Sequence, residues 1–280
     1  MKKYIRYADF ITLLLGVGGL LLRLVHMLGG TDGRGLYPSD HPAWIGLWVL
    51  TALVAVGLFL LTRQAEPAAE YQRNYTASIP GAIGCALAAL GVANAALGSV
   101  GKEPLDLICT LLGIGAAVGL AQAALARVQG KKPWDKGFFL LCAFWAGRAF
   151  LLGRQMGSEP ELCRYLPQML LCLAMIPACY QMWGFVADMG DRKKSLFWGL
   201  LAMYLCLVGI YGQDWLLHLT SAIWLMTNLC AMQVIPAPAT PIVEEAEVET
   251  AAPMADPLEN LDADAMVAEI LQKIERPTEE

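Results

Sequence analysis

Eight stretches of the chain are apolar over most of their length, and short polar segments separate them. A helix needs about 20 mostly apolar residues to cross a hydrocarbon layer about 30 Å thick. The pattern therefore predicts an all-α fold, a polytopic membrane helix bundle of about eight transmembrane helices within residues 1–235. The fifth and seventh stretches are the shortest, so we expect them to tilt little. The expected spans are residues 9–28, 43–62, 79–100, 107–126, 137–153, 166–187, 195–211 and 215–235.

Composition supports a membrane protein rather than a soluble domain. The chain is 57% hydrophobic and 16% charged, with a mean hydropathy of +0.50. An ordinary soluble domain carries about 25% charged residues. The first stretch is not followed by the small-residue cleavage site of a signal peptide, so we expect it to be retained as an anchor.

Basic residues in the loops divide unevenly between the two sides of the predicted bundle. Cytoplasmic loops of membrane proteins are enriched in Lys and Arg. The richer side is therefore predicted to be cytoplasmic, together with both termini. It carries Lys2, Lys3, Arg6, Arg63, Arg73, Arg127, Lys131, Lys132, Lys136, Arg192, Lys193 and Lys194. The other side carries Arg34, Lys102, Arg154 and Arg164.

The last part of the chain differs from the rest. From Val234 onward, twelve acidic residues accompany two basic ones. Residues 236–255 are rich in Pro and then acidic, which predicts a disordered linker. Residues 256–276 begin with a capping-box pattern and predict a short amphipathic helix. Its apolar stripe comprises Leu261, Val267, Ile270, Leu271 and Ile274.

The acidic character of this tail helix indicates a protein partner rather than a membrane surface. Anionic lipids would repel its acids, whereas the helix could dock into a groove on a cytosolic protein or onto the basic inner loops of its own bundle. One interpretation of the whole chain is therefore a membrane-anchored sensor or scaffold that recruits a cytosolic partner. No basic patch interleaved with aromatic residues indicates nucleic acid as a partner.

Small residues suggest close helix packing. Gly115 and Gly119 form a G-x-x-x-G pair, which lets two helices approach closely in lipid. The pair could pack within one bundle or form a homodimer. The seven cysteines inside the predicted spans are expected to be small packing residues, since no C-x-x-C pair occurs. Similar placement of Arg23 and Arg148, and of Asp106 and Asp214, leaves a repeat of two four-helix halves open.

Signatures of catalysis are missing from the sequence. The chain has no H-E-x-x-H, no G-x-S-x-G, no phosphate-binding loop and no dinucleotide-binding glycine pattern. Asp188 and Asp191 form a carboxylate pair at helical spacing, but the cations that follow them favour solvated ion pairing. These observations leave enzymatic activity uncertain and give more weight to a non-enzymatic role.

The most informative candidates are polar residues inside the outer half of the predicted spans. Charge within a bilayer is costly, so such residues usually face the bundle interior, a wet cavity or a partner. An outward-facing pocket rich in arginine would bind or transport a small anionic or lipid-like ligand. The alternative is that each arginine extends to the headgroups by itself. The candidate ligand-binding residues are Arg23, His26, Asn94, Arg148, Gln168 and His218, with Asp106, Arg154, Arg164 and Asp214 at the rim.

Two of these candidates allow a second interpretation. His26 and His218 could ligate a b-type haem between helices. Both lie near the same predicted surface, and no second histidine pair accompanies them, so this interpretation is weaker than the ligand pocket. We therefore expect no cofactor and no metal.

The first two predicted spans carry a further pattern. It runs from Arg23-Leu-Val-His26 through Asp32-Gly-Arg-Gly-Leu-Tyr37 to His41-Pro-Ala-Trp44. This stretch resembles a pattern in uncharacterised bacterial multi-pass membrane proteins. The resemblance implies a bacterial cytoplasmic (inner) membrane location, and it implies no activity.

The predicted orientation can be tested by labelling single cysteines in intact cells. We expect labels at positions 131 and 193 to be protected from membrane-impermeant reagents, because the basic loops stay inside. Labels at positions 33 and 101 should react. Reaction at position 193 in intact cells would reverse the orientation.

Overall fold

A computed structural model of the chain describes residues 7–30, 37–65, 68–75, 77–101, 103–158, 162–212 and 214–232. Over these residues the fold is helical, and the extended pairing is limited to one isolated bridge between Tyr75 and Met232. The all-α prediction is confirmed for this part of the chain. The predicted linker 236–255 and tail helix 256–276 lie outside the described residues.

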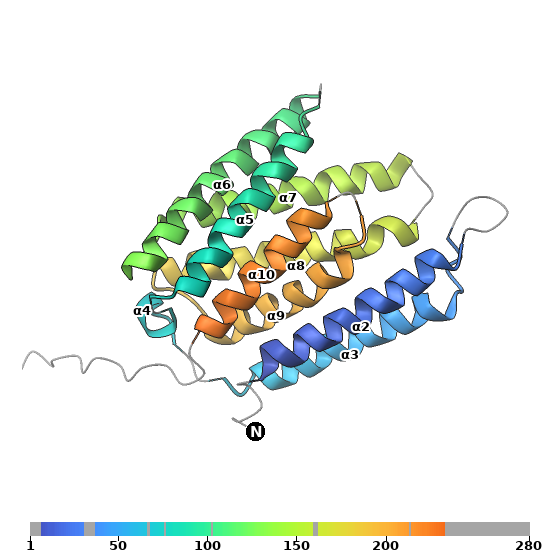
Figure 1. The fold of residues 1–280 in the computed structure, drawn as a ribbon, viewed down its shortest axis with the longest axis horizontal. Helices are drawn as coiled ribbons and strands as arrows, with labels where there is room; N and C mark the ends of the chain where they lie inside the picture. The colour runs from blue at the N-terminus through green and yellow to red at the C-terminus, as the bar shows by residue number, and fades with distance from the viewer. Residues whose placement is uncertain are drawn as a thin grey trace, which may run out of the picture. The chain divides into compact units, whose positions relative to one another are not determined.

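Each predicted apolar stretch forms one long helix, with ends that differ by a few residues from those expected (Figure 1). A single helical turn, α4, lies between the second and third long helices. The elements are α2 (Ala8–Leu28), α3 (Pro42–Thr62), α4 (Tyr71–Asn74), α5 (Ile79–Gly98), α6 (Pro104–Gln129), α7 (Asp135–Ser158), α8 (Leu162–Val186), α9 (Arg192–Gly209) and α10 (Trp215–Ala231).

Short polar segments begin and end these helices. The Ser78 side chain accepts a hydrogen bond from the Gly81 N–H at 3.2 Å and so caps the start of α5. Asp191 caps α9 in the same way through the N–H of Lys193 at 3.0 Å. Gly130 ends α6 with a φ of 66°, a left-handed conformation that glycine adopts without a steric penalty.

Six of the helices are long and apolar enough to cross a membrane, namely α2, α3, α5, α6, α7 and α8. The other two long helices, α9 and α10, are not long and apolar enough. α9 has 18 residues and begins with Arg192, Lys193 and Lys194, and α10 has 17 residues. At about 1.5 Å per residue, α10 is about 26 Å long. By length and composition, six of the eight predicted spans are therefore suited to cross a membrane.

The helices from α5 to α10 pack side by side in a closed ring. Each packs on the next in chain order, and α10 packs on α5 to complete the ring. α2 and α3 pack on each other and join the ring mainly through α9 (Figure 1). α9 thus contacts both parts, and every residue from position 202 to 209 is buried. A helix that is apolar all round suits this interior position.

The two four-helix halves are not packed alike. α8 and α9 pack extensively on each other in the second half, whereas the corresponding α3 and α5 form no extensive contact among the described residues. The repeat suggested by the sequence is therefore not reflected in the packing of the helices.

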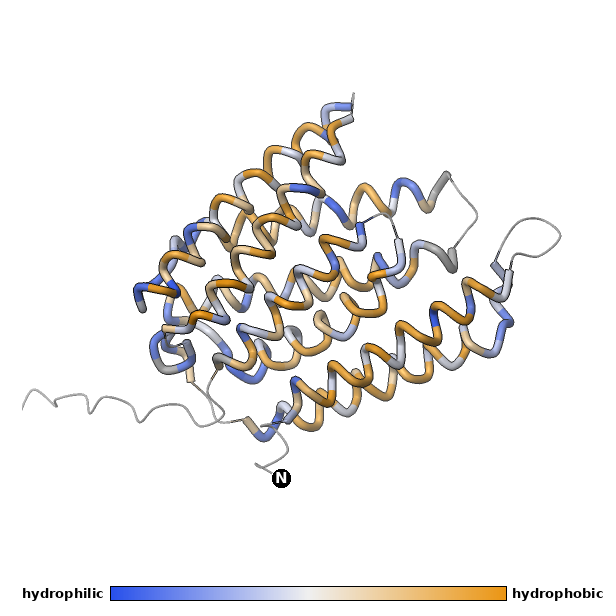
Figure 2. The backbone as a smooth tube through the Cα atoms, in the orientation of Figure 1, coloured by the Kyte–Doolittle hydropathy of each residue, from blue (hydrophilic) through white to orange (hydrophobic). Residues whose placement is uncertain are grey.

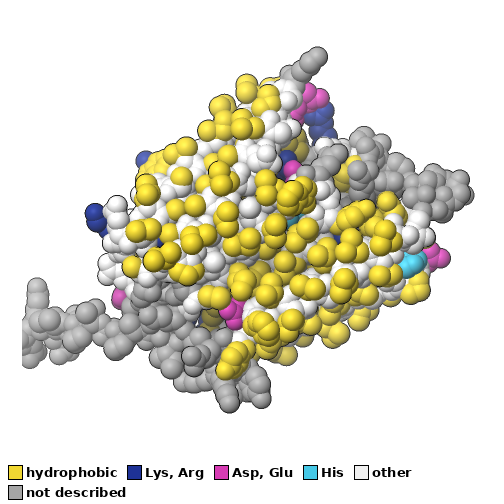
Figure 3. Space-filling model, viewed as in Figure 1, with side chains coloured by type: hydrophobic (Ala, Val, Ile, Leu, Met, Phe, Trp, Pro, Cys, Tyr) yellow, Lys and Arg dark blue, Asp and Glu magenta, His cyan; other side chains and the backbone are white. Residues whose placement is uncertain are grey.

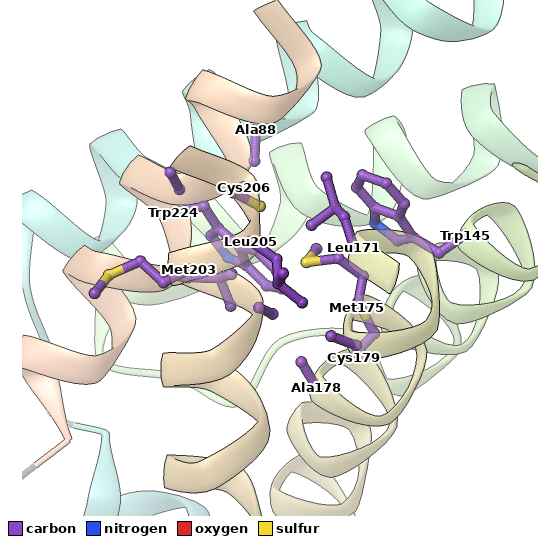
Figure 4. Close-up of a cluster of buried hydrophobic side chains, with 14 of the residues drawn as sticks. Ala88, Trp145, Leu171, Met175, Ala178, Cys179, Met203, Leu205, Cys206 and Trp224 are labelled. Carbon is purple, nitrogen blue, oxygen red and sulfur yellow. The ribbon is translucent and has the colours of Figure 1, made fainter. Parts of the chain in front are cut away.

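Large side chains fill the centre of the ring (Figure 4). Trp145 from α7 and Trp224 from α10 are each 1% exposed, and Met175 from α8 lies in the same cluster. Cys85, Cys172, Cys179 and Cys206 take part in this packing as expected, whereas Cys142 is half-buried and Cys230 is exposed. Cys85, Cys109, Cys172, Cys179 and Cys206 are all buried and free.

The exposed face of the bundle is apolar. Leu14 and Leu21 of α2, Leu53 of α3, Leu90 of α5 and Leu111 of α6 are each more than half exposed. Apolar residues dominate the middle of the helices, while polar residues gather towards their ends (Figure 2). In the view of Figure 3, hydrophobic side chains cover most of the described surface. A surface of this kind suits contact with lipid rather than water.

The G-x-x-x-G pair packs within the bundle. A Cβ on Gly115 would meet the Leu140 side chain of α7 at 3.0 Å. A Cβ on Gly119 would overlap the backbone of Gly137, at the start of α7. Both glycines therefore serve the contact between α6 and α7 of the same chain, as the packing interpretation proposed.

The contact at Gly119 gives a stability prediction. We expect Gly119→Ala to destabilise the purified protein by about 1–3 kcal/mol, because backbone atoms of Gly137 cannot move away as a flexible side chain can. The measurement is thermal unfolding in mild detergent. Gly57→Ala on α3 is the matched control, since a Cβ there would meet nothing within 4 Å. Equal effects at the two positions would show that the close approach of α6 and α7 is unimportant.

Candidate functional site

A cavity of about 1000 Å³ lies at one end of the bundle. Its walls come from the last turns of α2, α5 and α7, the first turns of α6 and α8, and the segment that joins α9 to α10. On the predicted orientation this is the outer end. The polar residues of the lining are Arg23, Tyr37, Asn94, Ser99, Asp106, Arg148, Gln155, Tyr165, Gln168, Tyr211 and Asp214.

The cavity brings together four of the six candidate residues from the sequence. Arg23 of α2, Asn94 of α5, Arg148 of α7 and Gln168 of α8 all line it. These residues are separated by up to 145 positions in the chain, and their shared depth in the predicted spans was the only sequence signal that linked them. The two candidate histidines do not belong to the lining.

Arg23 is enclosed by the protein. The residue is only 1% exposed, and its Nη1 donates a hydrogen bond to the backbone carbonyl of Val208 at 2.9 Å. This bond joins α2 to the last turn of α9. A buried guanidinium cannot extend to lipid headgroups, so the snorkelling interpretation does not hold for Arg23. The Arg23 guanidinium instead forms part of the cavity wall.

Arg148 and Asp214 form an ion pair between α7 and the start of α10. Their side chains are 12% and 26% exposed, so the pair is largely shielded from solvent but accessible from the cavity. His218 follows Asp214 by one turn and is buried beneath the pair. Its Nδ1 lies 2.6 Å from the Gly209 carbonyl oxygen at the end of α9. His218 therefore ties α10 to α9.

His26 belongs to an aromatic cluster between α2 and α3. Its Nε2 lies 3.0 Å from the Pro38 carbonyl oxygen, and its ring stacks on Trp44 with centroids 5.1 Å apart. The rings of His41 and Tyr37 lie 5.4 and 5.9 Å away. His26 and His218 thus occupy different packing environments, and each is engaged with a backbone carbonyl.

The charges that line the cavity balance. Among the described side chains the lining holds two arginines, Arg23 and Arg148, and two aspartates, Asp106 and Asp214. Arg154 is not part of the lining. It forms hydrogen bonds with Glu103, and these bonds, more than the charge itself, hold the pKa of Glu103 below its usual value. The excess of arginine expected from the sequence is therefore absent from the described lining.

Several lining residues were missed by the sequence reasoning. Gln155 follows Arg148 by seven positions on α7, and Tyr165 precedes Gln168 by three on α8. Helical periodicity places each pair on one face, so this signal could have found both. Tyr211 lies in the segment after α9, where no periodicity applies.

The opposite end of the bundle is closed by α4. The Arg127 guanidinium of α6 is 3% exposed and lies 4.4 Å from the Tyr75 ring centroid and 5.8 Å from that of Tyr71. It also donates a hydrogen bond to the Asn228 side chain of α10. Cation–π contact and hydrogen bonding together hold α4 against α6 and α10.

Asp188 fastens α4 from the other side. Its carboxylate accepts a hydrogen bond from the Tyr71 N–H at 3.0 Å and pairs with Lys132. Burial raises the pKa of Asp188, but these two partners together lower it further, and the net result is a pKa below the usual value. Asp191 pairs with Lys194 at 3.1 Å. Both aspartates thus form ion pairs, but only Asp191 pairs with one of the cations that follow it, whereas Asp188 pairs with Lys132.

Comparisons with known protein families, with curated proteins and with solved structures found no match to this chain. Among the described residues, no group of three His, Cys, Asp or Glu side chains is arranged to hold a metal ion. Functional inference therefore rests on the geometry of the cavity.

The Arg148–Asp214 pair gives a second stability prediction. We expect Arg148→Gln and Asp214→Asn each to destabilise the protein, because each leaves one partly buried charge without its partner. The double variant should be less destabilised than the sum, with a coupling of about 1–3 kcal/mol by thermal unfolding. Arg154→Gln and Glu103→Gln form the control cycle. That pair is about half exposed, so its effects should be additive. Additive effects in both cycles would show that the Arg148–Asp214 ion pair does not stabilise the cavity wall.

Proposed function

We propose that this chain is an eight-span protein of the cytoplasmic membrane, with both termini inside, that recognises a small ligand bearing an anionic group. The binding site is the cavity lined by Arg23, Asn94, Arg148 and Gln168. The observation that carries the proposal is the convergence of these four residues, from four helices, on one cavity.

Membrane insertion of all eight helices is supported by the packing. Six helices qualify by length and composition, and the two shorter ones are joined to them by extensive contacts. α9 and α10 are members of the ring and are largely covered by neighbouring helices, so they need less apolar surface of their own than helices that face lipid. A span a few ångströms short of the hydrocarbon thickness is accommodated by local thinning of the bilayer.

The chemistry of the lining favours a small polar ligand. Guanidinium groups donate several hydrogen bonds in a planar fork that matches carboxylate and phosphate groups. The Arg148 side chain reaches the cavity while it is paired with Asp214, and its remaining N–H groups can bind a ligand oxygen. Asn94 and Gln168 add amide groups that fix orientation. A volume near 1000 Å³ is ample for a small molecule.

The closed opposite end favours entry from the outer side. Arg127, Asn228 and Asp188 hold α4 across the cytoplasmic ends of α6 and α10. The cavity in this conformation therefore serves recognition from outside. Passage to the cytoplasm would require α4 to separate from these partners.

Binding can be tested with acetate and inorganic phosphate as probes, by their effect on the unfolding temperature of the full-length protein in detergent. A ligand that binds the folded state raises this temperature. We expect Asn94→Asp to weaken binding of the better probe at least tenfold. A new unit charge opposes an anion about 10 Å away by roughly 1.7 kcal/mol at an effective dielectric constant of about 20.

Gln129→Glu is the matched control, since it adds the same charge at the other end of α6, where Gln129 is exposed. It should bind the probe as the unmodified protein does. The proposal fails if neither acetate nor phosphate binds, or if Asn94→Asp and Gln129→Glu behave alike.

A further inference from the structure

The charge balance of the cavity carries an inference about its ligand, which rests on the proposed function. The described lining holds Arg23 and Arg148 against Asp106 and Asp214. A ligand with only a negative charge would leave this partly enclosed site with an uncompensated charge. Net charge in a low-dielectric site is costly, whereas a ligand that carries both signs keeps the site neutral.

Asp106 marks where a positive group would bind. It lies in the first turn of α6 and lines the cavity, with its carboxylate close to Gly101. Among the described residues this carboxylate makes no hydrogen bond and no ion pair, in contrast to Asp214, which pairs with Arg148. Arg154, the next cation along that side, is bonded to Glu103 instead.

Asp106 lies in the first turn of α6, where the helix dipole stabilises the negative charge of its carboxylate. The helix dipole by itself does not explain why the Asp106 side chain lines the cavity. The cavity also presents tyrosines, namely Tyr37, Tyr165 and Tyr211. Aromatic rings attract ammonium groups through their π faces. A carboxylate and several tyrosines on the same cavity form a suitable environment for an amine.

The arginines and Asp106 come from different helices. Arg148 lies on α7 and Arg23 on α2, while Asp106 lies on α6. A ligand could therefore contact Arg148 with its acidic group and Asp106 with its amino group at the same time. The lining thus offers one partner for the acidic group and one for the amino group of a small zwitterion.

We propose that the cavity binds a zwitterion, a small molecule or headgroup with one ammonium group and one carboxylate or phosphodiester group, and that Asp106 is the residue that selects the ammonium group. This chemistry is shared by free amino acids, by glycerophosphoethanolamine and by the headgroup of phosphatidylethanolamine.

The test compares each zwitterion with its halves on the full-length protein. The probes are glycine and glycerophosphoethanolamine, with acetate, dimethyl phosphate and ethanolamine as the half-ligands. We expect at least one zwitterion to bind ten times more tightly than its anionic half, measured by titration calorimetry or by the unfolding temperature. Asp106→Asn should abolish this preference and leave the affinity for the anionic half unchanged or higher.

Two variants separate a direct role of Asp106 from a structural one. Asp106→Glu keeps the charge and should keep a preference for the zwitterion. Asp135→Asn removes an exposed acid at the start of α7, outside the lining, and should behave as the unmodified protein does. The inference is overturned if the zwitterions bind no better than acetate or dimethyl phosphate, or if Asp106→Asn retains the preference.

The outcomes also separate this inference from the proposed function. If acetate or phosphate binds and Asn94→Asp weakens it, while zwitterions give no advantage, the anion site stands and the zwitterion inference fails. If no probe binds, both fail.

Reconstitution identifies the source of the zwitterion. If it is a lipid headgroup, soluble glycerophosphoethanolamine should bind in nanodiscs of phosphatidylglycerol and be excluded in nanodiscs of phosphatidylethanolamine. If the natural ligand is a free molecule, its affinity should be the same in both. Either result supports the zwitterion site.

Discussion

Polar side chains inside an apolar helix bundle must find partners within the protein, and much of this structure follows from that constraint. Arg23 bonds to the end of α9, Arg148 pairs with Asp214, and Arg127 bonds to Asn228. Each of these contacts joins two different helices. Without water nearby, an unpaired polar group costs several kcal/mol. The arginines therefore act as cross-links that fix which helices are neighbours.

These cross-links are distributed between the two ends of the bundle, and the middle is left to packing. Trp145, Trp224 and Met175 fill the ring between the cavity at one end and α4 at the other (Figure 4). Small residues allow helices to approach there, as at Gly119 and Gly137. The cavity lies where polar residues and helix ends replace this tight packing.

The same constraint determines what the cavity can hold. Its described charges are balanced, and Arg148 already has Asp214 as a partner. On the proposed function, a ligand that enters must preserve that balance or undergo a large change in hydration. Recognition by such a site depends on the arrangement of both signs of charge more than on the number of arginines.

Much of the fold could be predicted from the sequence, because hydrophobic periodicity and length are local properties. All eight long helices lie where the apolar stretches are, since a polar loop must end each of them. Depth in the predicted spans also placed Arg23, Asn94, Arg148 and Gln168 at one level. The same depth argument included His26 and His218, because depth along a helix does not tell which way a side chain faces.

The tertiary structure decided the rest. Which helices are neighbours depends on the shapes of side chains far apart in the chain, so the ring from α5 to α10 and the central position of α9 have no local signal. The pairing of Arg148 with Asp214, 66 positions apart, follows from that ring. Because Asp214 lies beside Arg148, the described lining is balanced in charge rather than rich in positive charge. By itself the sequence determined the helices, their apolar character and the depth of their polar residues. Only the packing of those helices decided which polar groups meet, because contact depends on direction and distance in space.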